Sequence, residues 1–455
     1  MSLLDKIIEN LPEVKPPTQK KLSFTTKLKW TGMILGLYFL LGLIPLYGLG
    51  KNALEQFTFL STILGASFGS IISLGIGPIV TGSIVLQLLK GSGLVNFDLT
   101  SDKGKKRFQG IQKLLSIFFI IVEAGIFVMM GGLSPETGIS PMILILQLFI
   151  GGILIMLMDE IVSKYGFGSG ISLFIAAGVS QQIFIQLLSP LPSLTNPDVP
   201  VGKIPLIVQS LSQGNTLQAT LALATIIATL AVFFIVVYVQ SIKVEIPLSF
   251  GRVAGHGIRW PLNLLYASNI PVILVSALLA NIQLFARLLQ NWGHPVLGTF
   301  SGNSPASGFV FWVSGPNLLQ ASIIGSLTSI MILQALCFLL VYIVGATLFS
   351  VFWVQTSGLD AASQAKQMVS SGLQIPGFRR DQRVLERMLQ RYIGPLSIMG
   401  GIAIGLVAGI ADLTGAIGTG TGLLLTVMII YKLYEDIAKQ HLYDMNPMMR
   451  KFVSF

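Results

Sequence analysis

The sequence predicts an all-α polytopic membrane protein with ten spanning helices, and four observations carry that prediction. Charged residues make up only 11% of the chain, less than half of the share of about 25% found in soluble domains. Apolar residues make up 53% of 455 residues, and one crossing takes about 20 of them. One apolar stretch is interrupted by helix breakers, and nearly all Lys and Arg residues fall on one side of the predicted membrane.

The interrupted stretch runs from residue 58 to 89. It contains no charged residue, but it carries Pro78 and several glycines, so one plain spanning helix is a poor fit. Broken backbone persists at membrane depth only where protein or a water-filled cavity surrounds it. We therefore expect a re-entrant segment at about 58–70 that leads into a span at 71–89, an arrangement typical of a channel or a transporter.

Apolar runs predict the order of the other elements. Residues 1–27 are polar and basic, and the LLDKIIENL segment within them has its apolar residues on one helical face, which indicates a short surface helix. Ten spans then follow: 28–46, 71–89, 111–130, 142–158, 170–188, 216–240, 264–285, 324–352, 392–410 and 416–434. The eighth is ambiguous, because residues 318–353 carry no charge and are too long for one ordinary span.

The distribution of positive charge resolves this ambiguity. With ten spans, all but Lys51, Lys203 and Arg287 of the 29 Lys and Arg residues lie on the side that holds both termini. Cytoplasmic loops are enriched in Lys and Arg, so both termini are expected in the cytoplasm. Two spans in the eighth run would place the Arg-rich segment that follows it outside. The eighth run is therefore expected to form one helix.

Ten spans divide into two five-helix halves around a polar connector. The predicted N-terminal half covers residues 28–188, the external connector 189–215 and the C-terminal half 216–434, with cytoplasmic loops at 241–263 and 354–391 and a cytoplasmic tail at 435–455. Because five is odd, the second half starts from the opposite side of the membrane. Inverted halves of this kind are common in membrane transport proteins.

Few residues in this sequence could carry chemistry. The three histidines form no metal-ligand pattern, and no P-loop or nucleophile motif occurs, so we expect neither an enzyme nor a metal site nor a cofactor. Glu123 is the one ionisable residue placed well inside a span, which suggests a functional role; a carboxyl satisfied by hydrogen bonds in the bundle is the alternative. Gly401, Gly405 and Gly409 repeat every four residues, which favours close helix packing.

Two further patterns have both a functional and a plain interpretation. Ile76 and Val80, and likewise Ile171 and Ile175, are four residues apart and share a helical face; such residues line a pore, or simply face lipid or core. Arg379, Arg383, Arg387 and Arg391 form a stripe at the same spacing, suited to phosphate oxygens. The alternative is that these arginines fix the topology or contact lipid head groups.

Four motifs together resemble the SecY family, the large subunits of the Sec protein-conducting channel, in its archaeal and eukaryotic branch. They are LGIGPIVTGSIVLQLL, YGFGSGISLFIAAGVSQ, YASNIPVIL and GFRR, in this order along the chain. The resemblance implies a channel subunit that moves unfolded secretory polypeptides across the cytoplasmic membrane and inserts membrane-protein segments into it. A small-solute secondary transporter is the alternative, but it would need converging polar groups at the midplane.

The resemblance also assigns roles to particular residues. It implies a plug that includes Thr58, Leu60, Ile63, Leu64 and Phe68, where several relatives carry an Arg in place of Phe68. It implies a ring of apolar side chains, which sheds water and blocks ions, formed by Ile76, Val80, Ile171, Ile175, Ile273 and Leu425. Spans two, three, seven and eight would form a lateral gate with a polar cluster of Thr81, Glu123 and Asn281.

The same resemblance implies partners. Arg252, Arg379, Arg380 and Arg383 would dock the ribosome through its RNA. Two small single-span subunits, of the SecE or gamma type and of the beta type, would clamp the bundle. Signal sequences, translocating polypeptides and membrane lipid complete the expected partners.

Overall fold

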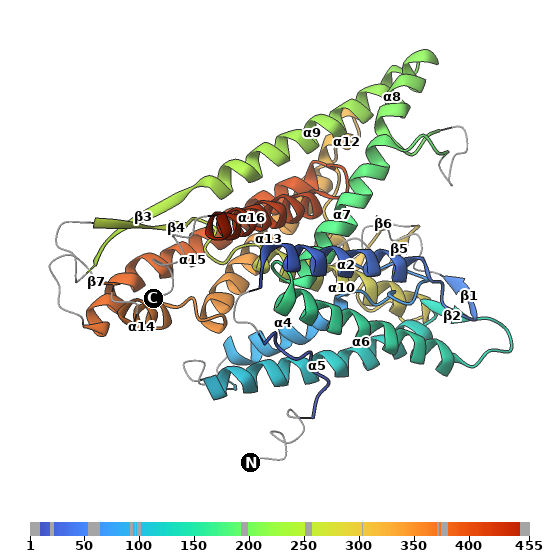
Figure 1. Ribbon diagram of the computed structural model, residues 1–455. Coiled ribbons are helices and arrows are strands. Elements are labelled where there is room, and N and C mark those ends of the chain that lie inside the picture. Colours follow the sequence, from blue (N-terminus) through green and yellow to red (C-terminus); the bar gives the residue numbers. More distant parts are fainter. Residues whose placement is uncertain are drawn as a thin grey trace.

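The computed structural model describes residues 10–18, 22–52, 64–91, 94–95, 97, 102–192, 199–250, 257–302, 304–370, 373–374 and 381–445. Long helices form a bundle whose two ends carry short strands and small helices (Figure 1). One end holds β1 (Leu49–Asn52) paired with β2 (Leu133–Pro135), and the other holds β3 (Lys243–Phe250) and β4 (Gly257–Asn263).

One long helix corresponds to each predicted span. The first half contains α2 (Phe24–Leu43), α4 (Gly77–Gly91), α5 (Asp102–Met129), α6 (Pro141–Tyr165) and α7 (Gly170–Leu188). The second half contains α9 (Thr216–Ser241), α10 (Ile270–Asn291), α13 (Ser329–Thr356), α15 (Gln382–Leu413) and α16 (Gly420–Met445). Short helices connect them: α8 (Lys203–Ser212), α11 (Gly308–Trp312), α12 (Leu318–Ile324) and α14 (Ala361–Ser370).

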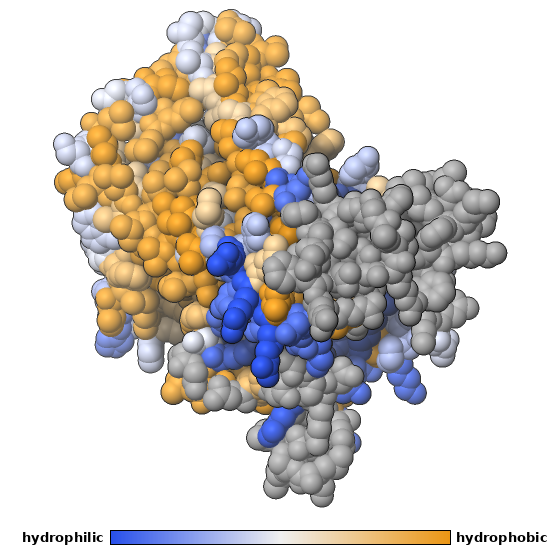
Figure 2. Space-filling view, turned by 90° about the vertical axis from the view of Figure 1, so that its left-hand side faces the viewer, coloured by the Kyte–Doolittle hydropathy of each residue, from blue (hydrophilic) through white to orange (hydrophobic). Residues whose placement is uncertain are grey.

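The described helices are those of a multi-pass membrane protein. Seven of them, α5, α6, α7, α9, α10, α13 and α15, are long and apolar enough to cross a membrane. The predicted count of ten is consistent with this result, with α2, the 15-residue α4 and α16 as the remaining spans. Figure 2 shows a broad apolar surface over one side of the molecule, and large exposed apolar areas mark contact with lipid or protein.

The eighth apolar run forms one span, as predicted. Its first part is the separate helix α12, which ends at Gly325 with a left-handed φ of +75°. Such a glycine terminates a helix without a Cβ penalty. The spanning helix α13 then begins at Ser329, five residues after the predicted start, with the Thr328 side chain accepting the Met331 N–H.

Two other predicted spans begin six residues later than expected. The second was placed at 71, but residues 71–76 form turns and α4 starts at Gly77. The Ser73 hydroxyl donates to the Ser70 carbonyl at 2.5 Å and accepts the Gly69 N–H at 2.9 Å, and such local bonds compete with a helix. The seventh span was placed at 264, but α10 starts at Ile270, after Ser268 adopts a φ of +60°.

The ninth span and the stripe residues Arg383, Arg387 and Arg391 form a single helix, α15, which begins at Gln382 rather than at the predicted 392. Its glycines pack closely, as predicted. A Cβ at Gly401 would lie 2.7 Å from the Thr347 Cα of α13, and one at Gly405 would lie 2.8 Å from the Tyr342 carbonyl oxygen. Helices approach this closely only where small residues face a neighbour.

The loops contain structure that the sequence analysis missed. The predicted connector at 189–215 contains α8, and the loop after α9 forms the β3–β4 hairpin. Residues Leu373–Gln374 add β7 to β3, giving the strand order β4-β3-β7. In β3 the apolar Val244 and Ile246 alternate with Lys243 and Glu245, a period typical of a strand. The fold is therefore mainly, but not purely, helical.

The largest buried cluster lies where the two halves meet. It contains apolar residues of α2, α4, α6 and α7 from the first half and of α9, α10, α13, α15 and α16 from the second. Both halves thus contribute to one core, and any pathway between the halves passes next to that core.

Candidate functional site

Residues 64–70 are folded into the bundle between α2 and α4. Leu64 is only 1% exposed, and its carbonyl oxygen accepts the Ile76 N–H at 2.7 Å. A Cβ at Gly75, which has a φ of +57°, would lie 2.1 Å from the same carbonyl oxygen. Only glycine fits this close approach. The expected re-entrant segment is present in this part of the chain, and Thr58, Leu60 and Ile63 of the expected plug lie outside the described residues.

Neutral hydrogen bonds tie this segment to its surroundings. The Leu46 N–H donates to the Gly69 carbonyl at 2.9 Å, and the Ser67 hydroxyl donates to the Gly42 carbonyl of α2 at 3.2 Å. The Asn52 amide of β1 donates to the Phe68 carbonyl at 3.2 Å. The Phe68 ring itself packs against the Phe127 ring of α5, with centroids 6.4 Å apart. These contacts hold residue 68 without a charge.

The six residues expected to form a ring lie in or against the central cluster. Ile76, Val80, Ile175, Ile273 and Leu425 are buried members of it, and the half-buried Ile171 packs against it. They come from the turn before α4, from the first turn of α4 and from α7, α10 and α16, so both halves contribute. A Cβ at Gly65 would lie 3.7 Å from the Ile76 Cγ2 atom, which places the re-entrant segment directly against this part of the cluster.

The three polar residues expected at the gate form a connected group. The Asn281 amide of α10 donates to the Thr81 hydroxyl of α4 at 2.9 Å, and this hydroxyl donates to Glu123 Oε1 of α5 at 3.1 Å. Glu123 is 2% exposed and Asn281 is 5% exposed. Within the described part of the chain, Asn281 Oδ1 has no hydrogen-bond partner. The cluster thus links the two halves by one hydrogen bond and leaves one buried acceptor unsatisfied.

A second contact between the halves, which the sequence analysis missed, lies at the far end of α4. The Lys90 amine donates to the Gln355 carbonyl of α13 at 3.1 Å. A Cβ at Gly91 would lie 2.5 Å from the Phe352 ring of the same helix. The interface between α4 and α13 is therefore closed at this end too.

The arginine stripe is helical and exposed where the structure describes it. Arg383, Arg387 and Arg391 are exposed on α15, whereas Leu385 and Leu389 on its other face are buried. Asp381 caps this helix by accepting the Arg383 N–H at 2.9 Å. Arg252, Arg379 and Arg380 lie outside the described residues.

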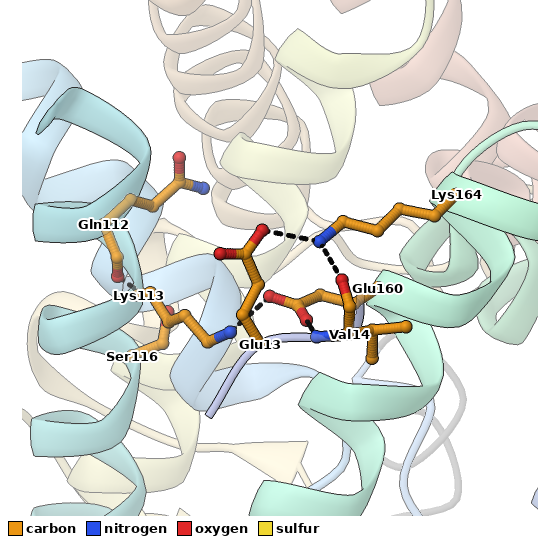
Figure 3. Close-up of polar contacts among 7 residues, drawn as sticks. All are labelled: Glu13, Val14, Gln112, Lys113, Ser116, Glu160 and Lys164. Carbon is orange, nitrogen blue, oxygen red and sulfur yellow. Dashed lines mark hydrogen bonds and ion pairs between the residues drawn. The ribbon is translucent and has the colours of Figure 1, made fainter. Parts of the chain in front are cut away.

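An attachment of the N-terminal segment is the other contact that sequence reasoning missed (Figure 3). The Val14 N–H donates to Glu160 Oε2 of α6 at 2.9 Å, and the Lys164 amine contacts Glu13 Oε1 at 2.7 Å. Lys113 of α5 forms an ion pair with Glu160. The Lys164 amine holds the pKa of the Glu13 carboxyl below its usual value through this hydrogen bond. Because these partners are distant in sequence, spacing alone could not reveal them.

The variant Lys164→Met is expected to release this segment. It removes the contacts of the amine with Glu13 and with the Val14 carbonyl, so a peptide covering residues 10–18 should exchange its amide hydrogens faster. The depressed Glu13 pKa gives the sign of the pH effect: attachment is full at neutral pH and weakens as pH falls through the lowered pKa. Lys15→Met is the control, since Lys15 contributes its backbone carbonyl to Tyr165. Equal exchange in all three proteins would contradict the attachment.

Together, the folded-in segment, the apolar cluster behind it and the polar link between the halves define a multi-pass membrane protein with the architecture of a channel. The SecY family model matches residues 70–434, and the model described as the plug domain of Sec61p matches residues 37–69. The chain belongs to the SecY family.

Individual relatives match over nearly the whole chain. The protein translocase subunit SecY of Methanothermobacter thermautotrophicus is 46% identical over 97% of this chain and 96% of its own length. A solved SecY translocation channel, whose plug domain is described as stabilising the closed state, has a TM-score of 0.83 at 41% identity, covering 97% of this chain and 98% of that one. Sec61 of the canine ribosome–channel complex has a TM-score of 0.81 at 39% identity, with the same coverage.

Proposed function

We propose that this chain is the channel-forming subunit of a protein translocase, which passes unfolded secretory polypeptides across the membrane and releases apolar segments sideways into lipid. The observation that carries this proposal is the contact between Leu64 and Ile76, which seats the re-entrant segment against the apolar cluster. Such a segment must leave before a polypeptide can pass. It therefore acts as a plug.

A covalent lock on the plug tests this function. A Cβ at Gly42 of α2 would lie 3.7 Å from the Ser67 Cβ atom, within the range of about 3.5–4.5 Å that a disulfide requires. The pair Gly42→Cys and Ser67→Cys, in a chain with Cys337→Ala, should therefore cross-link on oxidation and block translocation into proteoliposomes. Reduction should restore it, and each single cysteine variant is a control. Full translocation through the cross-linked protein would exclude the proposed role of the plug.

The proposed constriction consists of Ile76, Val80, Ile171, Ile175, Ile273 and Leu425. These apolar side chains come from both halves and meet in one buried cluster. An apolar constriction sheds water and so blocks ions while offering no charge to bind a passing chain. A small-solute transporter is not favoured, because its site needs converging polar groups near the midplane, and these positions hold Ile, Val and Leu.

The proposed lateral gate lies between α4 and α5 on one side and α10 and α13 on the other. The bond from Asn281 to Thr81 crosses it, and the Thr81 hydroxyl has two acceptors within reach, Glu123 Oε1 and the Gly77 carbonyl. A satisfied hydrogen bond between buried groups contributes only about 1 kcal/mol, and an unsatisfied buried acceptor such as Asn281 Oδ1 costs about 1–3 kcal/mol. The interface between the two sides of the gate, called the seam below, is therefore held only weakly, as a gate that opens between helices requires.

The proposed ribosome contact is the arginine stripe on α15 together with the loop after β3. The canine relative was solved bound to a ribosome. In this chain β7 pairs with the last residues of β3, so the segments that carry Arg252 and Arg379 leave neighbouring strands of one sheet. Exposed Arg383 and Arg387 lie on the helix that follows.

Replacing Arg252 and Arg379 with Glu should weaken ribosome binding and reduce its salt dependence. Each lost phosphate contact lowers the slope of log affinity against log salt by about 1, so the pair should lower it by roughly 2. Cosedimentation with ribosomes across a salt series measures this slope. Arg391→Glu, at the end of the stripe nearest the membrane, is the matched control. Unchanged affinity in the double variant would leave these arginines as topology signals.

The remaining proposals concern placement and partners. We place the chain in the cytoplasmic membrane with both termini in the cytoplasm, because all but three of its 29 Lys and Arg residues then lie inside. The halves are assigned to residues 28–188 and 216–434. Two small single-span subunits, of the SecE or gamma type and of the beta type, would cover exposed apolar faces of the bundle. Copurification from native membranes tests for them.

A further inference from the structure

Two turns, one in each half of the chain, are built in the same way. In the first half, Asp159 of α6 faces the sequence Gly168-Ser169-Gly170 at the start of α7. In the second half, Asp412 of α15 faces Gly418-Thr419-Gly420 at the start of α16. Gly168 and Gly418 both have a φ of +71°. The constriction and the gate as described do not use either carboxylate.

Each carboxylate binds the first turn of the helix that follows it. Asp159 Oδ1 accepts the Ile171 N–H at 2.9 Å and the Ser169 hydroxyl at 3.4 Å. Asp412 Oδ1 accepts the Thr421 N–H at 2.7 Å, and both of its oxygens accept the Thr421 hydroxyl at 3.0 Å. A carboxylate stabilises a helix N-terminus because it pairs with unsatisfied N–H groups and with the helix dipole.

The second glycine of each turn brings the two helices into direct contact. A Cβ at Gly170 would lie 2.5 Å from the Asp159 Cα atom, and one at Gly420 would lie 1.9 Å from the Ala411 carbonyl carbon. Neither position has room for a side chain. The start of α7 is thus fixed against α6, and the start of α16 is fixed against α15, in both cases by a carboxylate and a glycine.

A residue of the constriction follows at the same distance in both helices. Ile175 is five residues after Gly170, and Leu425 is five residues after Gly420. Both are buried in the central cluster. Because each side chain lies little more than one turn from the fixed helix start, a shift of that start would move the side chain with it.

We propose that Asp159 and Asp412 are matched positioning residues, which fix the starts of α7 and α16 and thereby hold Ile175 and Leu425 in the constriction. This inference rests on the proposed function. It assigns a role to two carboxylates that lie at span ends and bind the first turn of the following helix. They act on the pore through the helix that each one holds.

The second of these sites is also connected to the gate. The Tyr342 side chain of α13 lies beside the Asp412 carboxyl, and its hydroxyl lies 3.3 Å from the Ser276 hydroxyl of α10. Both α10 and α13 belong to the proposed gate. The site at Asp412 therefore joins a constriction helix to two gate helices, so its loss should disturb the pore more than the loss of Asp159.

A double-mutant cycle on resting ion conductance in planar bilayers tests the proposal. Asp412→Ala should raise resting conductance severalfold, and Asp159→Ala should raise it less. In a Leu425→Gly channel, which already lacks the side chain, Asp412→Ala should add almost nothing, because residues that act through one another are not additive. Asp381→Ala is the control: it removes the cap of α15, a helix with no constriction residue.

Each possible conductance result supports or contradicts the positioning role of Asp412. Unchanged conductance in Asp412→Ala, with Leu425→Gly conductive, would remove the positioning role and leave the channel function intact. If Asp412→Ala raised conductance by the same factor in the parent channel and in the Leu425→Gly channel, Asp412 would be a general stability residue. If Leu425→Gly left resting conductance unchanged, both the proposed constriction and the positioning role would be wrong. If Asp412→Ala does not fold, Asp412→Asn replaces it, because asparagine keeps an acceptor for the Thr421 N–H. Asp412→Asn should raise resting conductance by a smaller factor and should have no effect in the Leu425→Gly channel. Any other result with Asp412→Asn would contradict the proposal.

Discussion

Replacing Ile76 and Ile175 with glycine should raise resting ion conductance severalfold. Both side chains are buried in the central cluster; Ile76 lies in the turn just before α4, and Ile175 lies on α7. An apolar constriction excludes ions because it sheds water. Removing two of its side chains lets water and ions enter, even though the plug remains nearby. Planar bilayers that contain the reconstituted double variant provide the measurement.

The control for this experiment must be equally buried and must lie outside the constriction. Ile155 of α6 is fully buried in the same cluster, and α6 carries no proposed constriction residue. Truncating a buried isoleucine costs about 2–5 kcal/mol of stability, so all variants must first purify as intact, monodisperse protein. A rise with Ile155→Gly as large as that of the double variant would mean that conductance reports loosened packing rather than a ring.

Replacing Glu123 with leucine should let less apolar segments leave the channel sideways. The polar cluster is paired in the closed seam, and opening exposes its groups to lipid, which disfavours opening. Leucine removes that penalty and also removes one of the two acceptors of the Thr81 hydroxyl, leaving the Gly77 carbonyl as the other. The effect should be about 1 kcal/mol, or about a fivefold change in the ratio of inserted to translocated chains.

A graded series of Leu and Ala segments measures this ratio as an insertion threshold. Glu123→Gln is the matched control, because its amide oxygen still accepts the Thr81 hydroxyl, and its threshold should stay near that of the parent protein. Asn281→Leu removes the hydrogen bond that crosses the seam and should shift the threshold in the same direction as Glu123→Leu. An unmoved threshold in both leucine variants would make this cluster a packing feature only.

The sequence predicted the spans well because apolar composition and charge asymmetry are properties of whole segments. Its charges located the eighth span as one helix, and its resemblance to the SecY family grouped Thr81, Glu123 and Asn281 before their contacts were known. It missed the later starts of α4 and α10. Those starts depend on the left-handed backbone at Gly75 and Ser268 and on serine side chains that bond within a turn, and neither leaves a periodic signal.

The inverted arrangement of the two halves was predicted by counting spans. Which positions in one half correspond to which in the other is visible only in the three-dimensional structure. Gly75 and Ser268 have φ values of +57° and +60°, and each lies two residues before a helix. In both helices the second residue is a proline (Pro78 in α4, Pro271 in α10), and the fourth is a proposed constriction residue (Val80 in α4, Ile273 in α10). The match lies in backbone conformation and position rather than in residue identity. Contacts between distant segments, such as those of Val14 with Glu160 and of Lys90 with Gln355, were likewise beyond any local pattern.

The most direct test of the central claim is to ask which residues touch a polypeptide in transit. A photoreactive amino acid would replace Ile175 or Leu425 in turn, and a secretory chain would be halted midway by a folded domain at its C-terminus. The control is Leu230, which is 53% exposed on α9. Adducts to the halted chain from residues 175 and 425, with none from 230, are the predicted result. No adducts from the constriction positions, or an equal yield from residue 230, would contradict a polypeptide path through the center of this bundle.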